Sequence, residues 1–138
     1  MASYVLDTNS CIALINGKPP AVRARFRKAL SESAEIFVSS NAAFELWYGV
    51  AKSGQVETNS RLVETFFAGP ITVLPFDDED ASRAGALRAA LESSGRPIGA
   101  YDLLIAGQAL RRKLTLVTAN AREFAHVKDL SWENWATP

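Results

Sequence analysis

Short apolar runs recur along the chain, and each is bounded by polar or turn-forming residues. Runs of this kind, rich in β-branched and aromatic residues, are typical of buried strands. They lie at residues 3–6, 35–39, 71–73 and 114–118, with a further run at 130–135 that suits an edge strand. The stretches between them carry apolar residues at helical spacing, and most stop at glycine or proline. Helices are therefore predicted over residues 8–16, 21–30, 40–53, 56–68, 77–94 and 101–113.

This alternation of strands and helices predicts the fold class. The connections between strands are too long for hairpins, so the strands are expected to run parallel and to be covered by helices on both faces. We therefore expect an α/β protein, a three-layer α/β/α sandwich with a central parallel sheet. No repeat, low-complexity tract or linker divides the chain, and a single domain over residues 1–138 is expected.

The amino-acid composition excludes several kinds of site and partner. Fifteen basic and fifteen acidic residues cancel, so no global field draws the protein onto a polyanion. Cys11 is the only cysteine and His126 the only histidine, which excludes an internal disulfide and leaves no set of soft ligands for zinc. No apolar run approaches the roughly 20 residues of a membrane span, and no signal peptide is evident. We expect a soluble, cytoplasmic protein with no membrane partner, whose metal, if it binds one, has oxygen ligands.

Charged and aromatic residues also gather locally. The basic clusters at 23–28 and 111–113 are expected to be solvated helix faces, and the acidic run at 77–80 to cap a helix start. Around Glu45, Phe44 is expected to pack in the core. Trp47 and Tyr48 suit either core packing or contact with a base or a partner side chain.

Three carboxylates fall where such a sheet places its ligand site, beyond the carboxyl ends of the strands. Asp7 ends the first strand, Glu45 lies near the start of the helix that follows the second, and Asp102 near the start of a later helix. Side chains near a helix start tilt back toward that edge. Each acid alone could be a cap or a surface residue. Together, beside large apolar neighbours, they predict a site, because charges there are costly unless paired or metal-bound.

Further oxygen-bearing side chains follow the last strong strand. Thr118, Asn120 and Glu123 complete the predicted ring. Carboxylates this close repel one another, and a hard divalent cation removes the penalty. Mg²⁺ suits one or two direct carboxylates with waters, and Mn²⁺ would accept the same ligands. We assign Asp7 and Asp102 as primary ligands, with Glu45 binding through water or orienting the nucleophile.

Four segments resemble a known family, and their order along the chain makes the resemblance specific. The segments are VLDTN at 5–9, FELWYG at 44–49, GRPIGAYDLLIA at 95–106 and LVTANAREF at 116–124. Together they resemble PIN-domain toxins of the VapC type, and the similarity extends through residues 130–135. It implies a PIN-like fold and a Mg²⁺-dependent endoribonuclease that cuts structured RNA, usually tRNA, and so arrests translation. It also implies a homodimer neutralised by a VapB-type antitoxin, with DNA contacted only through that antitoxin.

The resemblance also implies roles for particular residues. The acidic triad of the family falls on Asp7, Glu45 and Asp102, and its supporting polar positions on Thr8, Asn9 and Thr118. Many PIN domains carry a fourth acid where this chain has Asn120, and the nearest acid is Glu123. Either of these two could take the place of the fourth acid, and the site could hold one or two metal ions.

Other functions fit the sequence less well. A receiver-type phosphoacceptor needs adjacent acids after the first strand and a lysine where Thr118 stands. A haloacid-dehalogenase-like phosphatase needs a second Asp where Asn9 stands. A catalytically silent PIN-fold RNA-binding or scaffold protein remains open, because fold alone does not fix activity.

Overall fold

The computed structural model describes residues 2–137 and contains five strands and seven helices within that range. The strands are β1 (Ser3–Leu6), β2 (Glu35–Ser39), β3 (Thr72–Leu74), β4 (Thr115–Val117) and β5 (Trp132–Glu133). The helices are α1 (Thr8–Asn16), α2 (Pro20–Ser31), α3 (Ser40–Lys52), α4 (Val56–Phe67), α5 (Asp78–Ser93), α6 (Ala100–Arg112) and α7 (Ala121–Phe124). Every predicted helix is present, and the expected edge strand is shortened to the two residues of β5.

All strand pairings are parallel, and the sheet order is β3-β2-β1-β4-β5. The chain builds outward from β1 through β2 to β3, then returns to the other side of β1 for β4 and β5. The order therefore reverses between β1 and β4. In open parallel sheets, a reversal of this kind leaves a crevice at the carboxyl ends of the two strands, where ligands bind.

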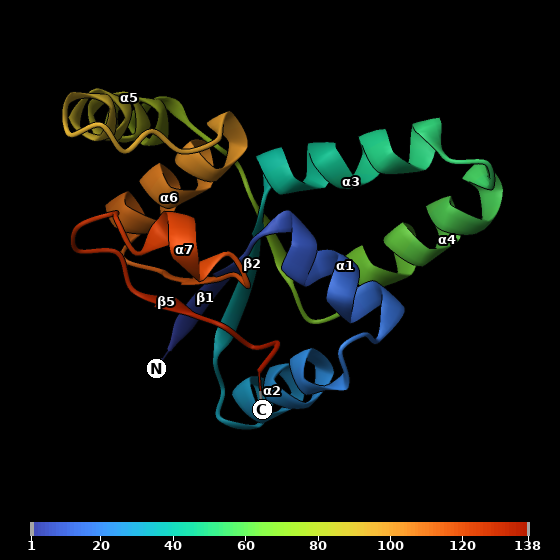
Figure 1. Cartoon of the computed structure of the whole chain (residues 1–138). Helices are drawn as coiled ribbons and strands as arrows, with labels where there is room; N and C mark the ends of the chain where they lie inside the picture. Colours follow the sequence, from blue (N-terminus) through green and yellow to red (C-terminus); the bar gives the residue numbers. More distant parts are fainter. Residues whose placement is uncertain (1, 138) are drawn as a thin grey trace.

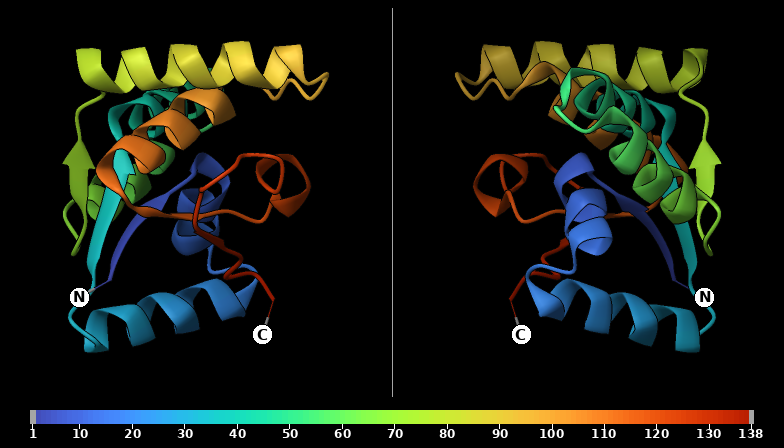
Figure 2. Two further views of the ribbon diagram at one scale, coloured as in Figure 1. Left: turned by 90° about the vertical axis from the view of Figure 1, so that its left-hand side faces the viewer. Right: turned by 90° about the vertical axis from the view of Figure 1, so that its right-hand side faces the viewer.

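The two faces of the sheet bury different helices because strand side chains alternate between faces. Tyr4 and Leu6 of β1 pack into a core formed with α1, α2, α3 and α4. Val5 points to the opposite face and packs into a core formed with α6 and α7. Figures 1 and 2 show the resulting layers, with α5 along one side of the molecule and α2 along the opposite side. The predicted three-layer α/β/α sandwich is confirmed.

Helix α5 packs on α6 through a very close approach and a buried ion-pair network. A Cβ added to Gly107 would lie 2.7 Å from the Cα of Ala84, so only glycine fits there. Asp80 is fully buried and accepts hydrogen bonds from Gln108, Arg111 and Arg112.

The prediction that residues 111–113 form a solvated basic face is wrong for Arg111 and Arg112. Both pair with the acidic start of α5, where Arg111 bonds Asp77, Glu79 and Asp80. The predicted cap is confirmed, because the side chains of Asp77 and Asp80 accept each other's backbone N–H. The same run of acids thus caps α5 and fastens it to α6.

The prediction that Phe44 packs in the core is also wrong. The buried face of α3 consists of Ala42, Leu46 and Val50, and Phe44 lies on another face with 54% of its surface exposed. Within residues 2–137, no helix combines the length and the apolar character needed to cross a bilayer.

Candidate active site

Asp7 is held in place by the central strand and by the helix that follows it. Its backbone N–H donates to the carbonyl of Val117, so the β1–β4 pairing continues to the point where the chain leaves the sheet. Its side chain caps α1 by accepting a 2.8 Å hydrogen bond from the backbone N–H of Ser10. The predicted cap is therefore present, and one face of the carboxylate remains for another partner. Only 7% of Asp7 is exposed.

Glu45 reaches the same place from α3. The Oγ1 of Thr8 donates a 2.6 Å hydrogen bond to Glu45 Oε1. A charge-assisted bond of this length fixes the carboxylate against the start of α1. The first residues of α1 therefore hold two of the three predicted acids.

Asp102 lies in the first turn of α6 and is the most perturbed of the acids. Its pKa is raised to about 7, first because burial penalises the charged form and next because of a hydrogen bond with Glu123 and the charge of Glu123. The charges of Asp7 and Glu45 raise the pKa of Asp102 further. Three carboxylates from distant parts of the chain therefore act electrostatically on Asp102.

One small pocket of about 110 Å³ joins most of the predicted site residues. Its lining comes from the end of β1 and the starts of α1, α3 and α6, and the predicted residues in it are Asp7, Thr8, Asn9, Glu45 and Asp102. Figure 1 shows how these elements are arranged.

The remaining predicted residues lie outside this lining. Glu123 contacts the site through Asp102, and Asn120 donates to Glu123 through its Nδ2 at 3.1 Å. Thr118 is fully buried, and its Oγ1 accepts from the backbone N–H of Asn120 at 2.9 Å. Thr118 and Asn120 thus shape the turn that presents Glu123 to the site.

The structure adds three residues that sequence reasoning did not assign to the site. Ser10 holds Asp7 through its backbone and also donates from its Oγ to the carbonyl of Val117 at 3.0 Å. Asn41 and Tyr101 line the pocket. The Nδ2 of Asn41 is buried and lacks a hydrogen-bond partner among residues 2–137. The only sequence signal that could have predicted Asn41 and Tyr101 is that they are close in the chain to Glu45 and Asp102.

The donor set fits a hard divalent cation. The side chains of the pocket offer a metal ion carboxylate, hydroxyl and amide oxygens as ligands. Cys11 of α1 points into the hydrophobic core and is not part of the pocket lining. Burial raises the pKa of the Cys11 thiol, which keeps it neutral. Within residues 2–137, no three Asp, Glu, His or Cys side chains converge into a ready-made ligand set. Mg²⁺ needs only one or two direct carboxylates and keeps its waters, and the acids that line the pocket can supply them.

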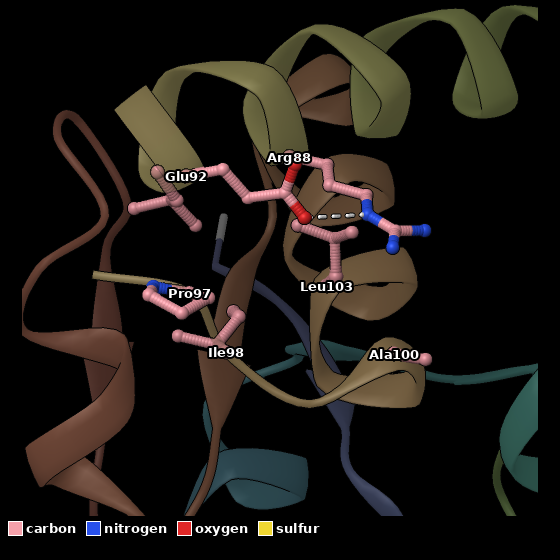
Figure 3. A pocket seen from close by; sticks show the side chains of 7 residues that line it. Arg88, Glu92, Pro97, Ile98, Ala100 and Leu103 are labelled. Atoms are coloured by element: carbon pink, nitrogen blue, oxygen red, sulfur yellow. Dashed lines mark hydrogen bonds and ion pairs between the residues drawn. The ribbon is translucent and has the colours of Figure 1, made fainter. Parts of the chain in front are cut away.

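A second pocket, of about 200 Å³, lies between α5 and the segment that leads into α6 (Figure 3). Figure 3 shows Arg88 and Glu92 paired on α5 above Pro97 and Ile98. This ion pair is 3.1 Å long, and both of its partners are largely exposed. None of the four acids lines this second pocket, whereas three of them line the pocket around Asp7. The candidate active site is therefore the pocket around Asp7.

Comparison with known proteins agrees with this geometry. Residues 4–130 match the sequence model of the PIN domain family. The chain is 41% identical to the tRNA(fMet)-specific endonuclease VapC of Shigella flexneri, and the match covers 99% of this chain and 100% of that protein. It is 39% identical to the protein of the same name from Salmonella typhimurium, over 98% of this chain and 99% of that protein.

Solved structures show the same similarity. The VapBC complex of Salmonella typhimurium bound to DNA contains a chain that is 40% identical, with a TM-score of 0.88, and the match covers 98% of this chain and 99% of that one. VapBC2 of Rickettsia felis, bound to a DNA fragment from its promoter, matches at 34% identity with a TM-score of 0.89, over 96% of this chain and 98% of that one.

Proposed function

The chain belongs to the VapC family of PIN-domain ribonucleases, and from this we propose that it is a Mg²⁺-dependent endoribonuclease toxin that cuts structured RNA and arrests translation. The substrate that we favour is tRNA, because the Shigella and Salmonella relatives are both named as tRNA-specific endonucleases. Nucleases of this family depend on a metal ion. The choice of Mg²⁺ rests on the oxygen ligands of the pocket.

One observation carries the proposal. Asp7, Glu45 and Asp102, which are far apart in the sequence, line a single pocket formed by the end of β1 and the N-terminal turns of α1, α3 and α6. Glu123 adds a fourth negative charge beside Asp102. Such a cluster is electrostatically unfavourable by itself and becomes favourable when a divalent cation is shared.

The residues have separate tasks in this proposal. Asp7 and Asp102 would hold the metal directly, and Glu45 would hold the metal through a water or orient the attacking water. Ser10 fixes the rotamer of Asp7 and Thr8 that of Glu45, so that both carboxylates are positioned before substrate arrives. A bound Mg²⁺ supplies a water of lowered pKa and neutralises charge on the phosphodiester in the transition state.

The partners follow from the relatives. The solved VapBC complexes pair a toxin with an antitoxin, and two of them are bound to DNA. We propose that this chain is a cytoplasmic toxin that forms a homodimer, is neutralised by a VapB-type antitoxin, and contacts promoter DNA only through that antitoxin.

Cleavage of total RNA in the presence of Mg²⁺ tests the function. We expect discrete fragments from the wild type, and their loss when EDTA is added or when Asp7→Ala or Asp102→Asn is introduced. Glu35→Gln is the matched control, because this exposed acid begins β2 at the opposite end of the sheet. Fragments that persist in both site variants would refute the mechanism. RNA that is bound but never cut would instead support a silent PIN-fold binding protein.

A further inference from the structure

Three exposed aromatic side chains form a continuous row beside the acidic pocket. Tyr101, Phe44 and Tyr48 are 47%, 54% and 56% exposed. The ring centroids of Tyr101 and Phe44 lie 6.0 Å apart, and those of Phe44 and Tyr48 lie 6.4 Å apart with the planes nearly parallel at 17°. We call these three residues the aromatic row.

The row is not a by-product of core packing. Phe44 and Tyr48 are four residues apart and therefore share one face of α3. The buried face of α3 is formed by other residues, and Tyr101 joins the row from the start of α6. Contiguous apolar surface exposed on a protein marks a binding site more often than chance placement does.

The two ends of the row differ in charge. Tyr101 lines the acidic pocket and directly precedes Asp102. At the other end, the Nζ of Lys52 lies 4.9 Å from the centroid of the Tyr48 ring. The row thus leads from the carboxylates proposed to hold the metal to a lysine cation.

This arrangement matches the chemistry of one kind of ligand. A strand of unpaired nucleotides carries flat bases that stack on aromatic rings and phosphates that attract cations. When its scissile phosphate is at the metal site, the bases next to that phosphate would meet Tyr101 and then Phe44. A base paired within a duplex has no free face for these rings.

We propose that the aromatic row binds the unpaired nucleotides that adjoin the scissile phosphate, by stacking their bases on Tyr101, Phe44 and Tyr48, with Lys52 beside a backbone phosphate. This inference rests on the proposed ribonuclease function of the same pocket. It makes the row a determinant of specificity, because RNA in which these nucleotides are paired would bind poorly.

Binding of a short single-stranded RNA tests the row apart from catalysis. The full chain carrying Asp7→Asn is used in Mg²⁺ so that the RNA is not cut, and 2-aminopurine is placed at successive positions to report stacking by loss of fluorescence. We expect quenching at neighbouring positions. Phe44→Leu and Tyr101→Leu should each raise Kd about five- to 150-fold, the range measured for loss of a base–aromatic stack. Tyr101→Phe, which keeps the ring, should restore binding.

Trp47→Leu is the matched control. Trp47 is an exposed aromatic residue of α3 outside the row, and its ring stacks on Phe67 at 6.2 Å. We expect the Kd of the Trp47→Leu protein to equal that of the Asp7→Asn protein without this change. The same RNA annealed to its complementary strand should bind more weakly than the single strand. Thermal unfolding of each variant verifies that it is folded.

Three results would overturn the inference. One is an unchanged Kd in both leucine variants, and another is equal binding of duplex and single strand. The third is a fall in molecular mass by analytical ultracentrifugation in the leucine variants but not in Trp47→Leu, which would assign the row to an interface between copies of this chain. Wild-type cleavage of total RNA is scored separately, so failure of the row and failure of the nuclease function are distinguishable.

Discussion

The hydroxyl of Thr8 donates a 2.6 Å hydrogen bond to the carboxylate of Glu45, and this single contact links the helices that follow the first and second strands. Helix α1 begins at Thr8, so the position of the hydroxyl is fixed by the central strand and the cap at Asp7. Glu45 would otherwise be free to turn away from its acidic neighbours. The bond therefore holds the glutamate in a place that charge repulsion alone would not favour.

Replacing Thr8 by valine should impair the metal site without unfolding the protein. Valine keeps the shape of threonine but removes the hydroxyl, and loss of such a supporting contact typically costs ten- to a hundredfold in metal affinity or activity. We expect the Mg²⁺ concentration for half-maximal cleavage to rise by about tenfold or more. Thr8→Ser, which keeps the hydroxyl, should behave like the wild type. Equal Mg²⁺ dependence in the valine variant would mean that Glu45 needs no such support.

The raised pKa of Asp102 predicts that metal binding depends on pH. With a pKa of about 7, the carboxyl is largely protonated below about pH 6 and cannot act as an anionic ligand. Apparent Mg²⁺ affinity and cleavage at limiting Mg²⁺ should therefore rise as the pH increases through 7. Glu123→Gln removes a negative charge beside Asp102, so the midpoint of this rise should move to lower pH. A midpoint that does not move would separate Glu123 from the site.

The same shift predicts how the metal-free protein responds to pH. Because the folded-state pKa of Asp102 lies above its ordinary value of 3.8, the folded protein holds this proton more tightly than the unfolded chain does. The contribution of Asp102 to stability is therefore fully present below about pH 4 and is lost as the pH rises through 7. Added Mg²⁺ should raise Tm more above about pH 8 than below about pH 6, because it binds the ionised folded site. Differential scanning calorimetry at several pH values measures both effects.

Sequence reasoning predicted that three distant acids lie together, and the structure places all three in the lining of one pocket. Residues that end a parallel strand or begin the next helix share an edge of the sheet, and this rule placed Asp7 and Glu45 together. Asp102 lies in the first turn of α6, which follows α5 and not a strand, so its placement came from its position at a helix start. The rule does not supply the strand order. The bond from Ser10 Oγ to the carbonyl of Val117 exists only because β4 lies beside β1, and no local pattern encodes that neighbour.

Other features depend on pairings across the fold. Glu123 was predicted to belong to the ring, but its hydrogen bond to Asp102 was not, because Glu123 lies on a helix of four residues that is too short to show periodicity. The sequence around Arg111 predicts a solvated side chain. Only the packing of α5 on α6 brings Arg111 to Asp80, which is 31 positions away. The exposure of Phe44 depends on which face of α3 the sheet covers.

Breaking the buried network at Asp80 should strongly destabilise the protein. Asp80→Asn leaves Arg111 and Arg112 without their buried partner, and removing one member of a buried ion pair costs about 3–5 kcal/mol. Glu79→Gln is the control, because this acid pairs with the same Arg111 but its side chain is 78% exposed. Its loss should cost at most about 1 kcal/mol. Urea unfolding of both variants measures the difference, and equal midpoints would contradict the assignment.

Asp80 also predicts a response to acid. Burial alone would raise its pKa, but hydrogen bonds from Arg112, from the backbone of Asp77 and from Arg111 outweigh burial and hold the pKa below its ordinary value. The stability that Asp80 contributes is therefore present above about pH 4 and is lost as the pH falls toward its folded-state pKa. The free energy of unfolding of the wild type should fall more steeply in acid than that of Asp80→Asn.

Two glycines should respond in opposite ways to alanine. At Gly107 of α6, a Cβ would lie 2.7 Å from the Cα and Cβ of Ala84, so α5 and α6 would have to separate, and overpacking of this kind costs about 1–3 kcal/mol. At Gly85 of α5, nothing lies within 4 Å of an added Cβ, so alanine should stabilise the helix by about 0.5–1 kcal/mol. Urea midpoints of Gly107→Ala and Gly85→Ala should therefore fall on either side of the wild type, with unchanged slopes. A Gly107→Ala protein as stable as the wild type would show that α5 can move away from α6 at little cost, because an alanine Cβ at position 107 has no room unless Ala84 moves.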